Sequence, residues 1–201
     1  MITISLLELL PAALEQAQFV TTALCALAGA AALALMHWVI PHTHLVDEAR
    51  GVNGGSLRVA YLVAFGLILH DFPEGFAMAN AYVSTPRLGV MVAVAIVLHN
   101  VPEEFVMALP AVLAGRRRFL SRAALVSAAA EPAGALIGLA GISAFPGLNA
   151  GFLAFAAGAM VFVSLHELVP MARQLGHHRA TEIGAAAGAA MFATLGLLVG
   201  A

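Results

Sequence analysis

Two short segments of this chain repeat one order of metal-binding residue types. LHDFPEG contains His70 and Glu74, and LHNVPEE contains His99 and Glu103. In each segment the histidine precedes the glutamate by four positions, so both side chains project from one face of a helix. Imidazole nitrogen and carboxylate oxygen are donor atoms that Zn²⁺ takes in proteins. The repeat therefore predicts two helices that pack together and bring two imidazoles and two carboxylates around a divalent cation.

Further polar residues flank this repeat. Asp71 and Asn100 follow the two histidines and are rotated from them by about 100°, still on the side of the glutamates. Glu131, in AAAEPAG, is a further acid within an apolar segment. Glu104 follows Glu103 and is rotated off its face. A metal ligand, a proton acceptor and an acid lining a cavity all remain open as roles for Glu104.

Four residues elsewhere are candidates for an additional metal site or an exit path. His166 and Glu167, in SLHELVP, lie near one end of a predicted helix, where an exit-path role competes with simple exposure at the membrane surface. His42 and His44 lie in a predicted loop, where they could collect metal or simply be solvated. The sequence leaves both alternatives open for each pair.

Prolines accompany the candidate ligands. Pro73, Pro102 and Pro132 each lack the N–H that an α-helix needs and clash with the carbonyl four residues earlier. Interrupted helices at membrane depth are tolerated where they line a polar cavity, and they are typical of transporter binding sites. We therefore expect unwound backbone beside the ligands.

The composition predicts a membrane protein. Hydrophobic residues make up 62% of the 201-residue chain and charged residues 10%, whereas a soluble domain has about 25% charged residues. A spanning helix needs roughly 20 apolar residues. We therefore predict an all-α fold, a polytopic transmembrane helix bundle that forms a single domain over residues 1–201, with a cytoplasmic loop at 41–57. Six spanning helices are expected at Ala17–Ile40, Leu57–Tyr82, Leu88–Leu113, Ala123–Phe145, Leu148–Ala172 and Ile183–Ala201.

The arginines predict the orientation in the cell membrane. The chain has no lysine, and eight of its nine arginines lie in the first, third and fifth connections between the predicted helices. Positively charged loops stay on the cytoplasmic side. The C-terminus is then expected outside.

Other functional classes find less support in the sequence. A net charge of −2 with no basic tail argues against nucleic-acid binding, and a single cysteine, Cys25, excludes an intrachain disulfide. One buried His–Glu pair could be purely structural, but two matching pairs plus Glu131 favour a compensating ion. An intramembrane metallohydrolase is one alternative, although no HExxH or GxSxG occurs, and we expect no enzyme. A proton-relay transporter or channel is the other.

Four ordered motifs resemble one known family. HDFPEG, HNVPEE, AEPAGALIG and AGAMVFVSLHELVP are similar to those of the ZIP (Zrt-, Irt-like protein) divalent-metal transporters, in the bacterial GufA-type branch. The resemblance implies eight helices with both termini outside, and a homodimer. The six predicted helices would correspond to the third to eighth, and residues 1–15 to the end of the second. The first helix and most of the second would then lie outside this chain.

The resemblance also implies a two-metal site. One ion would be held by His70, Glu74, His99 and Glu103, and a second by Asp71, Asn100, Glu131 and the two bridging glutamates. This chain has Asp71 where asparagine is common and Glu104 where glycine is frequent, so the extra acids are expected to change metal preference or to replace one metal by a proton or a basic group. The implied substrate is Zn²⁺, taken up into the cytoplasm, and the donor set also suits Fe²⁺, Mn²⁺ or Cd²⁺.

Overall fold

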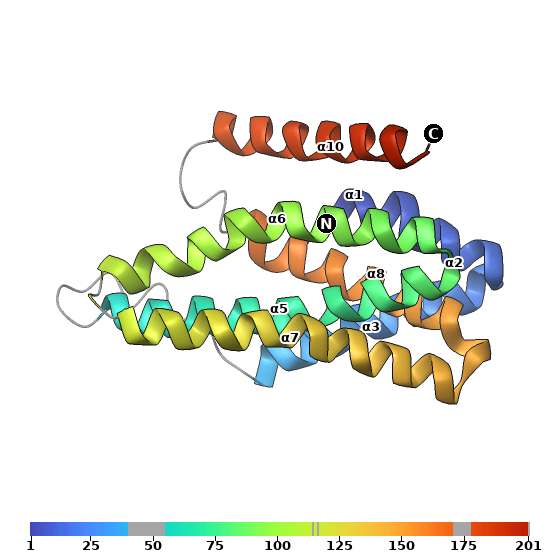
Figure 1. Ribbon diagram of the computed structural model, residues 1–201, viewed down its shortest axis with the longest axis horizontal. Helices are drawn as coiled ribbons and strands as arrows, with labels where there is room; N and C mark the ends of the chain where they lie inside the picture. The colour runs from blue at the N-terminus through green and yellow to red at the C-terminus, as the bar shows by residue number, and fades with distance from the viewer. Residues whose placement is uncertain (40–54, 114, 116, 171–177, 201) are drawn as a thin grey trace.

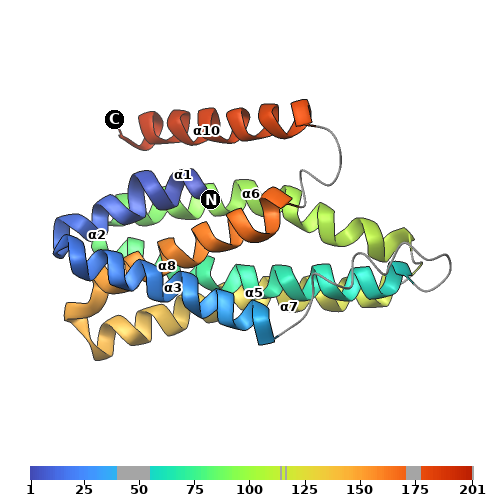
Figure 2. The same cartoon turned by 180° about the vertical axis from the view of Figure 1, so that it is seen from behind.

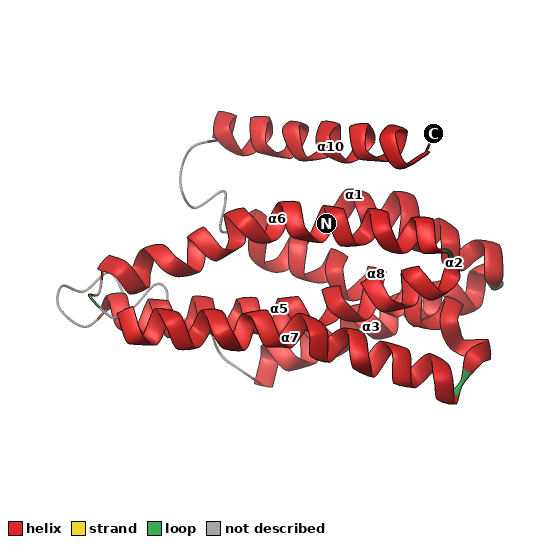
Figure 3. Ribbon diagram, viewed as in Figure 1, coloured by secondary structure: helices red, strands yellow, loops and turns green. Residues whose placement is uncertain are grey.

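The computed structural model describes residues 1–39, 55–113, 115, 117–170 and 178–200. Within these residues all regular structure is helical (Figure 3). Each of the six predicted apolar segments falls on a long helix, which confirms the all-α bundle. The helices are α3 (Phe19–Val39), α5 (Gly55–Ser84), α6 (Pro86–Leu113), α7 (Arg117–Ala144), α8 (Asn149–Val163), which a π-helical turn extends over Ser164–Leu168, and α10 (His178–Gly200).

The beginning of the chain is also helical. Helix α1 (Ile2–Ile4), a π-helical turn (Ser5–Leu9) and α2 (Leu10–Gln16) follow one another and pack beside α8. A three-residue turn, Pro146–Leu148, joins α7 to α8. The predicted 41–57 loop lies largely outside the described residues, and its last three positions, 55–57, already belong to α5.

The outer surface of the bundle suits lipid. Five helices in the described part of the chain are long and apolar enough to cross a membrane, namely α3, α6, α7, α8 with its extension, and α10. Large apolar side chains are exposed on these helices, for example Trp38 at 81% and Leu197 at 76%. Apolar surface on this scale marks a membrane or partner surface. The chain is therefore a multi-pass helical membrane protein.

The prolines do not unwind the helices. Helices α5, α6 and α7 continue through Pro73, Pro102 and Pro132, so the prediction of unwound backbone is wrong. Both α5 and α6 instead bend along their length (Figure 1). A proline removes one backbone hydrogen bond and displaces the preceding turn, which commonly bends a helix without ending it.

Glycines let α5 and α7 approach each other backbone to backbone. A Cβ atom on Gly75 would lie 1.8 Å from the carbonyl oxygen of Glu131, and one on Gly134 would lie 2.1 Å from that of Phe72. Small residues at helix contacts are the usual means of close packing in membranes. The pair α5–α7 is therefore held at a separation that only glycine permits.

The same device joins α3 to α8, which lie side by side (Figure 2). A Cβ atom on Gly29 would lie 1.9 Å from the carbonyl oxygen of Phe155, and one on Gly158 would lie 1.9 Å from that of Ala26. Between the two pairs, the ring of Phe76 on α5 packs against Phe152 and Phe155 on α8, with centroids 5.6 and 6.2 Å apart. The bundle thus contains two glycine-packed pairs with an aromatic contact between them.

These contacts predict the effect of adding one methyl group. Gly75→Ala should destabilise the protein by about 1–3 kcal/mol or more, because the new Cβ meets backbone that cannot rotate away. Gly188→Ala, on α10, is the matched control, because no atom lies within 4 Å of its added Cβ. That change should stabilise the helix by up to about 1 kcal/mol. Thermal unfolding in detergent measures both, and equal melting temperatures for the two variants would contradict the close α5–α7 contact.

Candidate metal centre

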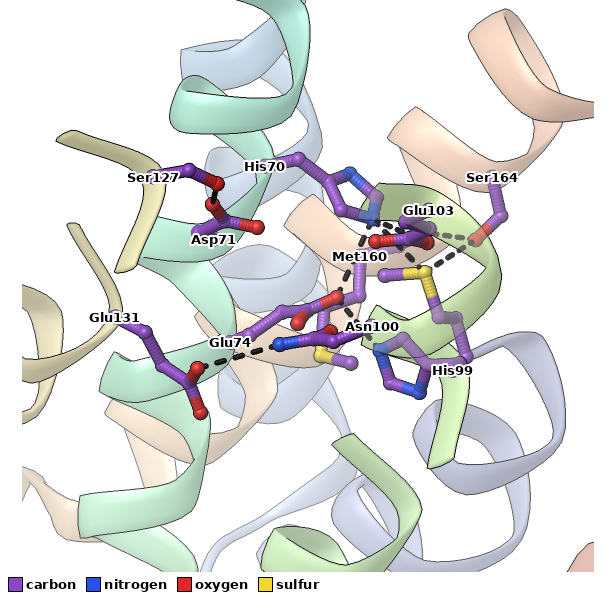
Figure 4. Close-up of polar contacts among 11 residues, drawn as sticks. His70, Asp71, Glu74, His99, Asn100, Glu103, Ser127, Glu131, Met160 and Ser164 are labelled. Carbon is purple, nitrogen blue, oxygen red and sulfur yellow. Dashed lines mark hydrogen bonds and ion pairs between the residues drawn. The ribbon is translucent and has the colours of Figure 1, made fainter. Parts of the chain in front are cut away.

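Glu74 is the centre of the polar cluster inside the bundle. Its side chain is fully buried, and its Oε1 atom lies 2.9 Å from His99 Nε2 and 3.2 Å from His70 Nε2 (Figure 4). His70 and Glu74 come from α5, where the four-residue spacing places them on one face, and His99 comes from α6. The predicted meeting of the two repeated segments is therefore present.

Glu103 of α6 completes a compact group with the two α5 residues. Its Oε1 atom lies 3.4 Å from His70 Nε2. One donor atom each from His70, Glu74 and Glu103 lies within 4.8 Å of the others. Zn²⁺ binds nitrogen and carboxylate oxygen at about 2.0–2.2 Å, so small side-chain movements would bring these atoms around one ion. His99 lies on the other side of Glu74 and contacts the same oxygen.

Two buried carboxylate oxygens fit the idea that the group receives a cation. The Oε2 atoms of Glu74 and Glu103 are buried and accept no hydrogen bond from the described residues. An unsatisfied buried acceptor costs about 1–3 kcal/mol, and a charged one costs more. A divalent cation between the helices would satisfy both atoms.

A methionine sulfur also faces the group. The Sδ atom of Met1 lies 3.0 Å from His70 Nε2 and 3.8 Å from Ser164 Oγ. A thioether is a soft donor that suits soft cations. Met1 and Ser164 were not predicted from the sequence, because neither belongs to a repeated motif and neither carries a charge that would mark it within an apolar segment.

The second implied ligand set does not form one cluster here. Asn100 Nδ2 donates a hydrogen bond to Glu131 Oε2 over 3.3 Å. Asp71 is turned toward α7, where it accepts a hydrogen bond from Ser127. Among the described residues, one group of at least three His, Cys, Asp or Glu side chains is compact enough to hold a single ion, and it consists of His70, Glu74 and Glu103.

Glu104 also faces α7. Its Oε1 atom lies 3.1 Å from Ser127 Oγ. The Glu104 carboxylate therefore has a hydroxyl on a third helix as its partner. Ser127 was not predicted from the sequence, since a serine among alanines carries no recognisable signal.

The remaining candidates lie elsewhere or outside the described residues. The exposed His166 packs edge-to-face against His37, with ring centroids 4.7 Å apart, and stacks on Phe162 at 4.9 Å. His37 was not among the predicted candidates. The loop residues His42 and His44 and the side chain of Glu167 lie outside the described part of the chain.

The chain is similar to known zinc transporters. The family model described as ZIP zinc transporter matches residues 42–201. The zinc transporter ZupT of Corynebacterium aurimucosum is 36% identical over 210 residues, which cover 96% of this chain and 79% of that protein. ZupT of Corynebacterium glutamicum is 37% identical over 213 residues, 96% of this chain and 81% of its own. The zinc transporter GufA of Myxococcus xanthus is 36% identical over 163 residues, which cover 79% of this chain and 63% of that protein. No solved structure matches.

The geometry predicts unequal roles for the two histidines. His70→Ala should lower the affinity of the purified protein for Zn²⁺ more than His99→Ala, because His70 contacts both glutamates whereas His99 contacts one. Loss of a partner that only orients a ligand costs about 10–100-fold in affinity, so we expect His99→Ala in that range and His70→Ala beyond it. Calorimetric titration with Zn²⁺ measures both, with exposed Glu15→Gln as the control. Equal losses would contradict the asymmetry.

Proposed function

This chain belongs to the ZIP zinc transporter family, and from that premise we propose that it carries Zn²⁺ across the membrane through the group of His70, Glu74 and Glu103. The observation that carries the proposal is the position of Glu74, a fully buried carboxylate in contact with imidazoles from two helices. Ionisable groups inside membrane helices are costly and are a mark of ion pathways. Since the family is one of transporters, the chain is not an enzyme.

The proposed path exchanges water for protein ligands. An entering ion sheds water and gains Glu74 and Glu103 oxygens and the His70 nitrogen in its place. Binding must be strong enough to replace hydration and weak enough to allow release. Carboxylates serve this need because one or both oxygens can coordinate, so the ion can leave step by step. Rocking of the helices would then open the group to the cytoplasmic side.

Zinc is the proposed substrate, and other divalent ions are proposed competitors. Imidazole favours Zn²⁺ and Fe²⁺, whereas carboxylate oxygen also accepts Mn²⁺. The nearby Met1 sulfur supports Cd²⁺ as a further competitor, since a thioether favours soft ions. Asn100 and Glu131 are proposed to hold a second ion together with Glu74 and Glu103 when the side chains rearrange around it.

A proton relay is the alternative that uses the same residues. The buried Oε2 atoms of Glu74 and Glu103, which accept no hydrogen bond from the described residues, favour a metal ion, because a divalent cation between them would satisfy both. Metal analysis separates the two ideas, since a pure proton relay retains no ion through purification.

Transport tests the proposal directly. Glu74→Gln and Glu103→Gln should each reduce zinc uptake into proteoliposomes by about tenfold or more, because the neutral amide no longer offsets the charge of the ion, and hydrogen bonds to charged groups are worth about 1.5–3 kcal/mol. Glu15→Gln, an exposed substitution of the same type, should transport as the unsubstituted protein does. Unchanged uptake in both cluster variants would refute the mechanism.

We also propose that the C-terminus faces outside the cell. Eight of the nine arginines lie in the first, third and fifth connections, which are on the other side of the membrane from the C-terminus, and arginine-rich connections stay in the cytoplasm. A cysteine added after Ala201 in a Cys25→Ala background should react with a membrane-impermeant maleimide on intact cells. Arg117→Cys, at the start of α7, is the matched control and should react only after permeabilisation. The reverse pattern of labelling would invert the proposed topology.

A further inference from the structure

A serine on α7 holds two acids that flank the proposed ion site. Ser127 is 2% exposed, and its hydroxyl donates a hydrogen bond to Asp71 of α5. The same oxygen lies 3.1 Å from Glu104 Oε1 of α6. Ser127 therefore joins three helices at one buried point.

Both acids are next to proposed ligands in the sequence. Asp71 directly follows His70, and Glu104 directly follows Glu103. Figure 4 shows the Asp71 carboxylate directed toward Ser127, on the opposite side from the contact between His70 and Glu103. Both acids are thus next to proposed ligands in the sequence, while one carboxylate oxygen of each lies against Ser127 on α7.

The hydroxyl is what makes this orientation favourable. A buried carboxylate without a hydrogen-bond donor pays the desolvation cost of its charge. A hydroxyl has one hydrogen, so Ser127 donates to one carboxylate at a time, and Asp71 and Glu104 share this single donor. If the hydroxyl were removed, the nearest way for either carboxylate to recover a partner would be to turn toward the cation.

Such a change would alter the chemistry of the ion site. The group of His70, Glu74 and Glu103 offers nitrogen and oxygen, which suits Zn²⁺. Additional carboxylate oxygens would move the donor set toward the oxygen-rich environments that Mn²⁺ and Mg²⁺ prefer. The orientation of Asp71 and Glu104 is therefore a determinant of selectivity.

We propose that Ser127 is a positioning residue for selectivity: its hydroxyl holds the Asp71 and Glu104 carboxylates toward α7 and so leaves the ion to the His70–Glu74–Glu103 group. The inference rests on the proposed transport function and adds to it a residue that contacts no ion itself.

The test compares zinc and manganese uptake by the full chain in proteoliposomes. Ser127→Ala should lower the ratio of the zinc to the manganese transport efficiency by about tenfold, the size expected when a hydrogen bond to a charged group is lost. The KM for Mn²⁺ should fall while the KM for Zn²⁺ rises. Ser127→Thr retains the hydroxyl and should restore the ratio. Ser143→Ala is the matched control on α7, since that exposed hydroxyl bonds only to its own helix at Leu139.

A double-variant comparison separates positioning from general damage. The double variant Asp71→Asn, Glu104→Gln and the triple variant that adds Ser127→Ala should have the same zinc-to-manganese ratio. The residues through which Ser127 acts have lost their charge in both. A purely structural serine would lower both rates equally in either background, and that result would overturn the proposal. If the unsubstituted chain transports neither ion, the transport function itself fails. If it transports zinc and the Ser127→Ala ratio is unchanged, only the role of Ser127 fails.

Discussion

A carboxylate inside a membrane bundle must find a partner, and the arrangement around Glu74 follows from that need. Its side chain has no exposed surface, and one of its oxygens is shared by imidazoles from α5 and α6. The cost of burying an unpaired charge exceeds the gain from any single apolar contact. The relative rotation of α5 and α6 is consequently fixed by the requirement that His70 and His99 both reach Glu74, and the apolar faces of the two helices are left to meet lipid or neighbouring helices.

Close packing supports this polar contact. Gly75 is the residue directly after Glu74, and the carbonyl of Glu131 occupies the space that a Cβ would need. Helix α7 can therefore approach α5 beside the cluster, which brings Glu131 near enough to α6 to accept a hydrogen bond from Asn100. The glycine of the first motif thus has a structural function that is separate from metal chemistry, and it explains why the acid and the glycine occur as neighbours.

The sequence predicted the parts of this structure that depend on periodicity and burial cost. Apolar runs identified the long helices, and the four-residue spacing identified His70, Glu74, His99 and Glu103 as one group. The direction in which Asp71 and Glu104 turn could not be predicted, because it depends on the rotation of α7 and on one serine among alanines. Met1 could not be predicted either, since only its neighbours in space distinguish a methionine at the ion site from a methionine in the apolar core. The prolines misled because a continuous helix can bend around a proline when its neighbours remain packed.

One position of the repeat has a different structural role in each half. The residue after the motif glutamate is Gly75 in the first half and Glu104 in the second, and both meet α7. In the first half the absence of a side chain lets the backbones of α5 and α7 touch. In the second half a long acid on α6 reaches Ser127 of α7. A single position thus sets how each helix meets α7. The histidines and glutamates of both halves still meet at Glu74, although His70 contacts both glutamates and His99 only one.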